Sequence, residues 1–189
     1  MESMFALATG LSLAAAVGLN AYIPLLSIGI LSRLGLIELV GPFDLIGHGL
    51  VLAILAVLAI IDFVGDKLPA IDSGFHALGL IISPVAGAIV TLSSQGDLVT
   101  IHPVLLVVAG LIVALSTHGS RAAMRPIITA ATGGTANPVV SAIEDASALV
   151  LTILAIFLPV VALVVAIAGA FVAYRVFRRA TSVWQKREA

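Results

Sequence analysis

Four charged residues stand in two pairs, each spaced four positions apart, inside a strongly apolar sequence. Asp62 and Asp66 form the first pair, and Arg121 and Arg125 form the second. A spacing of four places both members of a pair on one helix face, where like charges repel each other. We expect each pair to relieve the repulsion within the other. This favours a salt-bridge lattice between two helices or, alternatively, a site where the acids hold a cation or proton and the arginines an anion.

A long polar stretch, RPIITAATGGTANPVVSAIED, separates two apolar runs. Asn137 followed by Pro138 is typical of a helix start, with asparagine at the N-cap and proline in the first turn. The pair Gly133 and Gly134 would let the preceding backbone turn tightly with its N–H groups exposed. Bare N–H groups at a helix start attract anions. We predict either a re-entrant segment at residues 126–136 that ends at a polar cavity, or an ordinary capped loop.

Three further acids lie within or beside apolar runs. Glu144 and Asp145 follow the predicted helix start by two turns and, as neighbours, point about 100° apart. One of them would enter the helix bundle while the other reaches toward the membrane interface. Acids at this depth are costly and mark either a function or a buried pair. Asp72, in the stretch LPAIDSGF, is predicted to be the N-cap of the next apolar segment.

The stretch GLNAYIP predicts a break in the first apolar run. Pro24 has no N–H group, so the carbonyl of Asn20, four residues earlier, loses its helical partner. Asn20 therefore offers a backbone oxygen and a side-chain amide at one place, and both need partners in hydrocarbon. Two alternatives follow. Asn20 is bonded to a neighbouring helix beside a proline kink, or the break faces a ligand as the broken helices of transporters do.

The composition places these groups in a membrane. Hydrophobic residues make up 61% of the 189-residue chain and charged residues only 10%, against roughly 45–50% and about 25% in average soluble domains. The absence of cysteine excludes disulfides and thiolate metal sites, and a net charge of −1 gives no electrostatic case for nucleic acid. The four histidines show no metal-ligand spacing and no cofactor fingerprint is present, so we expect neither a metal nor a cofactor.

Six apolar segments are long enough to cross a bilayer core of about 30 Å. They cover residues 4–31, 47–66, 74–92, 98–119, 138–158 and 160–179. We therefore predict an all-α, polytopic membrane protein with about six transmembrane helices, some of them broken or re-entrant. Residues 1–180 would form one transmembrane domain and residues 181–189 a basic cytoplasmic tail. A similarity between DFVGDKLPAIDS and HGSRAAMRPIIT also suggests an internal repeat.

The distribution of basic residues predicts the orientation. Five of the nine lysines and arginines follow Tyr174, which places the C-terminus in the cytoplasm by the positive-inside tendency. An even number of spans then places the N-terminus there too. The small residues Ala14, Ala15, Ala16 and Gly18 favour close helix contact, and we expect a homo-oligomer on that ground.

Three polar blocks occur in a fixed order among the apolar helices. They are GLNAYIPLL, DKLPAIDS and RPIITAATGGTANPVVSAIED. This order resembles the bacterial integral membrane family catalogued as domain of unknown function 4126, over roughly residues 8–170. The resemblance implies a small multi-spanning membrane protein and brings no established activity.

The residues themselves favour a small transporter or channel-like protein of the bacterial inner membrane. An ion, a small solute or an anionic headgroup would bind among broken helices in the cytoplasmic half. The candidate ligand-binding residues are Asn20, Asp62, Asp66, Asp72, Arg121, Arg125, Gly133, Gly134, Asn137, Glu144 and Asp145. One alternative is a scaffold or accessory subunit that contacts another membrane complex and uses its polar blocks as internal staples. Another is a metal-dependent enzyme acting on lipid headgroups through Asp62, Asp66 and Glu144.

Overall fold

The computed structural model describes residues 2–39, 41–65, 69–94 and 101–188, and within these ranges it is helical with no strand. The predicted all-α fold is therefore confirmed. The elements are α1 (Glu2–Leu19), α2 (Tyr22–Arg33), the short 3₁₀ helix η1 (Gly41–Gly47), α3 (Gly49–Gly65), α4 (Pro69–Ser93), α5 (Pro103–Thr132), α6 (Asn137–Phe157) and α7 (Pro159–Glu188).

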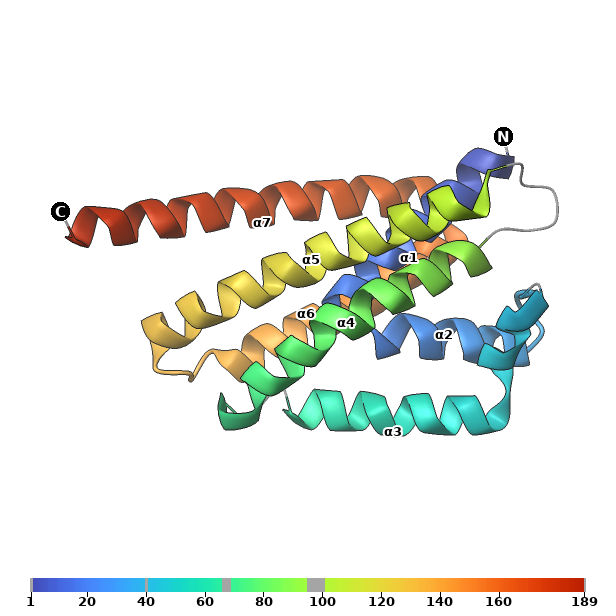
Figure 1. Ribbon diagram of the computed structural model, residues 1–189, viewed down its shortest axis with the longest axis horizontal. Coiled ribbons are helices and arrows are strands. Elements are labelled where there is room, and N and C mark those ends of the chain that lie inside the picture. Colours follow the sequence, from blue (N-terminus) through green and yellow to red (C-terminus); the bar gives the residue numbers. More distant parts are fainter. Residues whose placement is uncertain (1, 40, 66–68, 95–100, 189) are drawn as a thin grey trace.

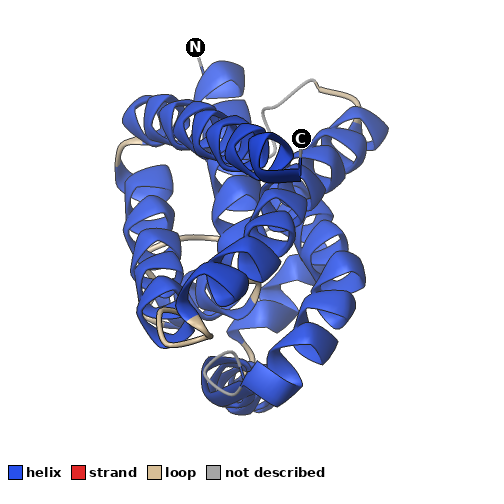
Figure 2. Ribbon diagram, turned by 90° about the vertical axis from the view of Figure 1, so that its left-hand side faces the viewer, coloured by secondary structure: helices blue, strands red, loops and turns tan. Residues whose placement is uncertain are grey.

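The helices form an elongated bundle around α1 (Figures 1 and 2), which packs against α4, α5, α6 and α7. Close approach is possible because the middle of α1 is small: Ala14 and Ala16 are fully buried. A Cβ atom on Gly18 would lie 2.7 Å from the carbonyl oxygen of Ala114 in α5. These small residues therefore make contacts within one chain, and the predicted homo-oligomer loses the feature on which it rested.

The first apolar run is a helical hairpin. α1 ends at Leu19 and α2 begins at Tyr22, so the predicted break at GLNAYIP is confirmed, with Pro24 in the first turn of α2 where a missing N–H is tolerated. In Figure 1, α1 runs from the N-terminal end of the bundle toward its middle, and α2 runs back. Leu13 of α1 and Ile28 of α2 accordingly line one pocket. The prediction of a single span over residues 4–31 is wrong.

The number of candidate membrane spans is smaller than predicted. By length and composition, three helices can cross a membrane: α5, α6 and the part of α7 that ends at Arg179. The pair η1 and α3, bent by 63°, gives a fourth if it forms one span. α1, α2 and the described apolar part of α4, Leu78–Ser93, are shorter. The structure thus supports three or four spans among its described residues, rather than six.

The turn between α5 and α6 differs from the predicted re-entrant segment. α5 continues through Pro126 to Thr132, so residues 126–132 extend a long helix. Gly133 and Gly134 have φ angles of 61° and 83°, a left-handed conformation that glycine adopts without strain. Their N–H groups are not bare, because both donate to the carbonyl of Thr129 and close the end of α5.

Both predicted N-caps lie inside helices instead. Asn137 is the first residue of α6, and its side chain exchanges hydrogen bonds of 2.9 and 3.2 Å with Thr129 of α5. The cap position belongs to Ala136, which has no side-chain hydrogen bond to the helix. Asp72 is the fourth residue of α4, because that helix begins earlier, at Pro69. Proline at a first helical position fits the earlier start.

Candidate ligand site at the α1–α2 break

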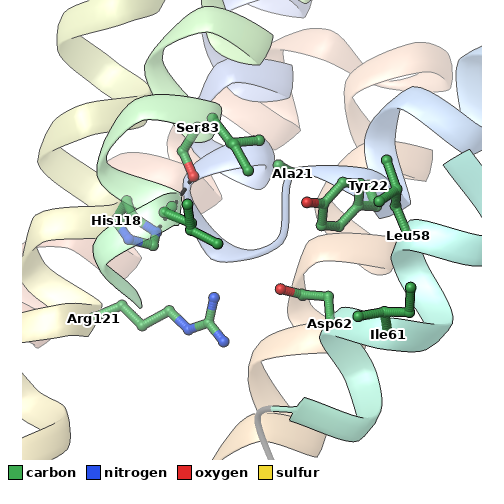
Figure 3. A pocket seen from close by; sticks show the side chains of 11 residues that line it. Ala21, Tyr22, Leu58, Ile61, Asp62, Ser83, His118 and Arg121 are labelled. Carbon is green, nitrogen blue, oxygen red and sulfur yellow. Dashed lines mark hydrogen bonds between the residues drawn. The ribbon is translucent and has the colours of Figure 1, made fainter. Parts of the chain in front are cut away.

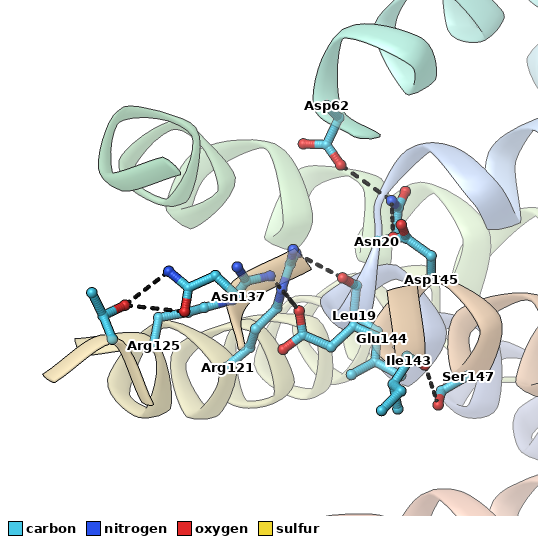
Figure 4. A network of polar contacts seen from close by, with 11 residues as sticks. Leu19, Asn20, Asp62, Arg121, Arg125, Asn137, Ile143, Glu144, Asp145 and Ser147 are labelled. Atoms are coloured by element: carbon cyan, nitrogen blue, oxygen red, sulfur yellow. Dashed lines mark hydrogen bonds and ion pairs between the residues drawn. The ribbon is translucent and has the colours of Figure 1, made fainter. Parts of the chain in front are cut away.

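Asn20 joins three helices at the tip of the hairpin (Figure 4). Its side chain is buried, and its amide nitrogen donates to Asp62 of α3 at 3.1 Å and to Asp145 of α6 at 2.9 Å. Its amide oxygen accepts from the backbone N–H groups of Tyr22 and Ile23 at 3.0 and 3.1 Å. The side chain therefore caps the start of α2 and holds two acids that come from different helices.

Arg121 closes the other half of the break. Its Nη1 donates to the carbonyl of Leu19 at 2.7 Å, and its Nε donates to Glu144 at 2.7 Å. Arg125 donates to the same oxygen of Glu144, also at 2.7 Å. The side chains of the two arginines are 5% and 3% exposed and that of Glu144 is 15% exposed. A nearly buried carboxylate thus bridges two nearly buried guanidinium groups.

This arrangement changes the predicted roles of the acids. Among the described contacts, Glu144 bridges the two arginines, a role that was not predicted for it, and Asp62 is bonded to Asn20 and faces Arg121 across a pocket. Asp66 lies outside the described residues. Glu144 and Asp145 both turn toward other helices, the first toward α5 and the second toward the hairpin tip. Both acids therefore have polar partners on other helices.

A pocket of about 330 Å³ lies beside this network (Figure 3). The described polar residues of its lining are Tyr22, Asp62, Ser83, His118 and Arg121, and the other described lining residues are Ala21, Leu58, Ile61, Leu78, Gly79 and Ile82. Figure 3 shows the carboxylate of Asp62 and the guanidinium group of Arg121 pointing toward one another from α3 and α5. The pocket therefore presents opposite charges on opposite walls, within a mostly apolar surround.

The sequence-predicted residues are divided between three places. Asp62 and Arg121 line the pocket, while Asn20, Arg125, Glu144 and Asp145 complete the network behind it. Gly133, Gly134 and Asn137 lie at the α5–α6 turn, apart from the pocket lining. Asp72 is placed only by its position in α4. Only part of the predicted set therefore lies together at one site.

Three of the described polar lining residues were not predicted to belong to the site: Tyr22, Ser83 and His118. His118 is buried, and its Nδ1 lies 3.3 Å from the hydroxyl oxygen of Ser83. Its spacing of three from Arg121 places both on one face of α5, and that spacing is a usable sequence signal. Tyr22 follows the break directly. Nothing in the sequence around Ser83 marks it, because its contact depends on how α4 packs against α5.

The described carboxylates do not form a metal site. In the described part of the chain, no group of three His, Cys, Asp or Glu side chains is placed to hold a metal ion. Asp62 and Glu144 are directed to different partners, Asn20 and the two arginines. The arrangement gives no support to the lipid-headgroup enzyme, which needs these carboxylates at one point.

The comparison with known protein families identifies the chain over nearly its whole length. The family described as domain of unknown function (DUF4126) matches residues 7–179. No curated protein and no solved structure matches the chain. The matched range contains all three polar blocks that carried the resemblance, and it also contains Arg121. The chain is therefore a member of the DUF4126 family.

Proposed function

We propose that this protein is a small membrane transporter or channel-like protein whose solute occupies the pocket at the hairpin tip. One observation carries the proposal: a pocket of about 330 Å³ reaches Asp62, His118 and Arg121 beside a broken helix. Ionisable groups inside an apolar bundle are costly, and in membrane proteins they mark pathways and binding sites. Broken helices are the usual place where such sites bind a substrate or an ion.

The pocket belongs to the end of the bundle that carries the basic C-terminal residues. Asp145 is eight residues beyond the start of α6, which is about 12 Å along the helix axis. That start lies at the same end of the bundle as the C-terminal end of α7 (Figure 1). The basic residues after Tyr174 favour a cytoplasmic location for this end. We therefore propose a site in the cytoplasmic half of a bacterial inner membrane.

The arrangement of the helices favours a revised orientation, in which the N-terminus lies on the side of the membrane opposite to the C-terminus. The two chain ends lie at opposite ends of the long axis of the bundle (Figure 1), because α1 and α2 form a hairpin rather than one span. We expect reporter fusions at residue 1 and residue 189 to lie on opposite sides of the membrane, with residue 189 cytoplasmic. Alkaline phosphatase and fluorescent-protein fusions measure this directly. Two cytoplasmic signals would contradict the hairpin and restore the six-span topology.

Water access to the pocket is the direct test of the proposed function. The natural chain has no cysteine, so single thiols can be introduced without background. We expect Ser83→Cys in the pocket to react with a small charged thiol reagent roughly tenfold or more faster than Ser12→Cys, because only an accessible thiolate reacts. Ser12 is the matched control, since it is fully buried in α1 and lines none of the pockets described.

Comparison with an exposed reference thiol distinguishes the two leading functions. Thr135→Cys, at the exposed α5–α6 turn, gives the rate of a thiol in open solvent. A Ser83→Cys rate between those of Ser12→Cys and Thr135→Cys supports a solvated site. A rate equal to that of Ser12→Cys would mean that the pocket is dry, and the transporter proposal would fail.

A scaffold is the second candidate because the polar network is so well bonded within the chain. Asn20 uses both its amide nitrogen and its amide oxygen within the bundle, and Arg121 closes the end of α1. Such groups would serve as internal staples in a protein that contacts another membrane complex. Membrane lipids are proposed partners in both cases, and a homo-oligomer stays a prediction.

A further inference from the structure

The pocket has an apolar edge that faces out of the bundle. Three of its lining residues are substantially exposed: Leu58 by 37%, Ile61 by 47% and Leu78 by 56%. They belong to α3 and α4, which pack together only sparsely and diverge along their length in Figure 1. In a membrane, exposed aliphatic side chains of this kind contact lipid chains. The pocket therefore connects sideways to the region that acyl chains occupy.

The inner end of the same pocket is polar and carries both charges. Arg121 supplies a guanidinium group whose side chain is only 5% exposed, and His118 and Ser83 stand beside it. Guanidinium groups match the oxygen geometry of phosphate. The carboxylate of Asp62 faces them from α3 (Figure 3). A ligand that carries a phosphate and an ammonium group would pair with both walls at once.

We propose that the pocket binds the headgroup of a zwitterionic phospholipid that has a primary ammonium group. The phosphate lies toward Arg121 and His118, the ammonium group donates to Asp62, and the acyl chains leave between α3 and α4. This inference rests on the proposed function and names its ligand. A volume of about 330 Å³ is at the small end for ligand pockets, which suits a headgroup with its chains outside.

The primary amine follows from the lining. A quaternary ammonium group has no N–H to donate to Asp62, and proteins bind it in cages of several aromatic rings. Among the described residues that line this pocket, Tyr22 is the single Phe, Tyr or Trp. An anionic headgroup without an amine has the same phosphate for Arg121 but offers Asp62 no ammonium group. Both alternatives should bind less well than an ethanolamine headgroup.

The test measures lipid binding to the purified full-length chain by native mass spectrometry. Three lipids with identical acyl chains are compared, carrying ethanolamine, choline or glycerol headgroups. We expect the ethanolamine lipid to bind about tenfold more tightly than the other two, because it alone satisfies both walls. Asp62→Asn should reduce that preference to about twofold or less, since an amide still accepts from Asn20 but carries no charge.

Control variants separate the pocket from the rest of the surface. Asp44→Asn removes an acid on η1, outside this pocket, and should keep the preference. Gly79→Ala places a methyl group against the ring of His118, whereas the same change at Gly119 meets nothing within 4 Å. We expect Gly79→Ala to weaken binding of the ethanolamine lipid and Gly119→Ala to leave it unchanged.

The outcomes distinguish this inference from the proposed function. Equal binding of the three lipids, or a preference that survives Asp62→Asn, would overturn the inference. If soluble glycerophosphoethanolamine displaces the lipid at equal concentration, the acyl chains contribute nothing and the ligand is a soluble solute. The lipid inference then fails while a reactive Ser83→Cys still supports transport. If Ser83→Cys reacts no faster than Ser12→Cys and the three lipids bind equally, both the lipid inference and the transporter proposal are contradicted.

Discussion

Replacing Glu144 with glutamine should destabilise the protein by about 3–5 kcal/mol, because it leaves two nearly buried arginines without their shared carboxylate. Glu144 accepts from Arg121 and Arg125 through one oxygen, at 2.7 Å in both cases. Glutamine keeps the size of the side chain and one acceptor oxygen, so the loss measures charge rather than packing. Thermal unfolding followed by size-exclusion chromatography in detergent gives the change in stability.

A second substitution makes this result specific to the bridge. Arg125→Gln in the Glu144→Gln chain removes one of the two cations that shared this carboxylate, and part of the lost stability should return. Glu38→Gln is the control, since Glu38 is an exposed acid outside the helices. A double variant whose loss equals the sum of the two single losses would mean that the two side chains act independently. The bridge would then contribute little to the fold.

Asn20→Asp should have a comparable or larger effect despite the nearly identical shape of the two side chains. The amide nitrogen of Asn20 donates to Asp62 and Asp145, and aspartate would place a third carboxylate between them. Both hydrogen bonds are lost and three acids converge, which should cost at least about 3–5 kcal/mol. The cap on α2 survives, because a carboxylate also accepts from Tyr22 and Ile23. Yield in the membrane and thermal midpoint both report the loss.

Exchange of the two groups is the sharpest check on Asn20. In the chain with Asn20→Asp and Asp62→Asn together, the amide and the carboxylate have changed places, and we expect partial recovery. Asn137→Asp is the matched control. Asn137 is also buried, and its side chain is hydrogen-bonded to Thr129 of α5. Asn137 begins α6, and the helix dipole favours a negative charge at that position. A loss at Asn137 as large as that at Asn20 would contradict the role given to the two acids.

Local chemistry made part of this site predictable. The break at GLNAYIP follows from Pro24 alone, because a missing N–H acts on the residues within one turn of it. The same reasoning found Asn20 as the residue whose groups need partners. Membrane character follows from composition, since no fold could bury so many apolar side chains away from a bilayer. These predictions needed no knowledge of how distant helices meet.

Predictions that depended on distant contacts fared less well. Glu144 bridges Arg121 and Arg125, and predicting that contact requires the relative positions of α5 and α6. Spacing along one helix does not contain that information. The prediction of one span over residues 4–31 was wrong for a related reason. A proline break permits either a kink in the helix or a reversal of the chain direction. Packing of α2 against α3 and α6 decides between them.

The α1–α2 hairpin also imposes an order on the synthesis of the chain. Its tip is held by groups that the ribosome makes much later: Arg121 follows Leu19 by 102 residues, and Asp145 follows Asn20 by 125. Until then the carbonyl of Leu19 lacks its cap and Asn20 lacks one of its acids, and hydrocarbon offers no substitute. The first helices to be synthesised are thus the last to form all their contacts. The tip of the hairpin must stay in contact with water until α6 has been synthesised.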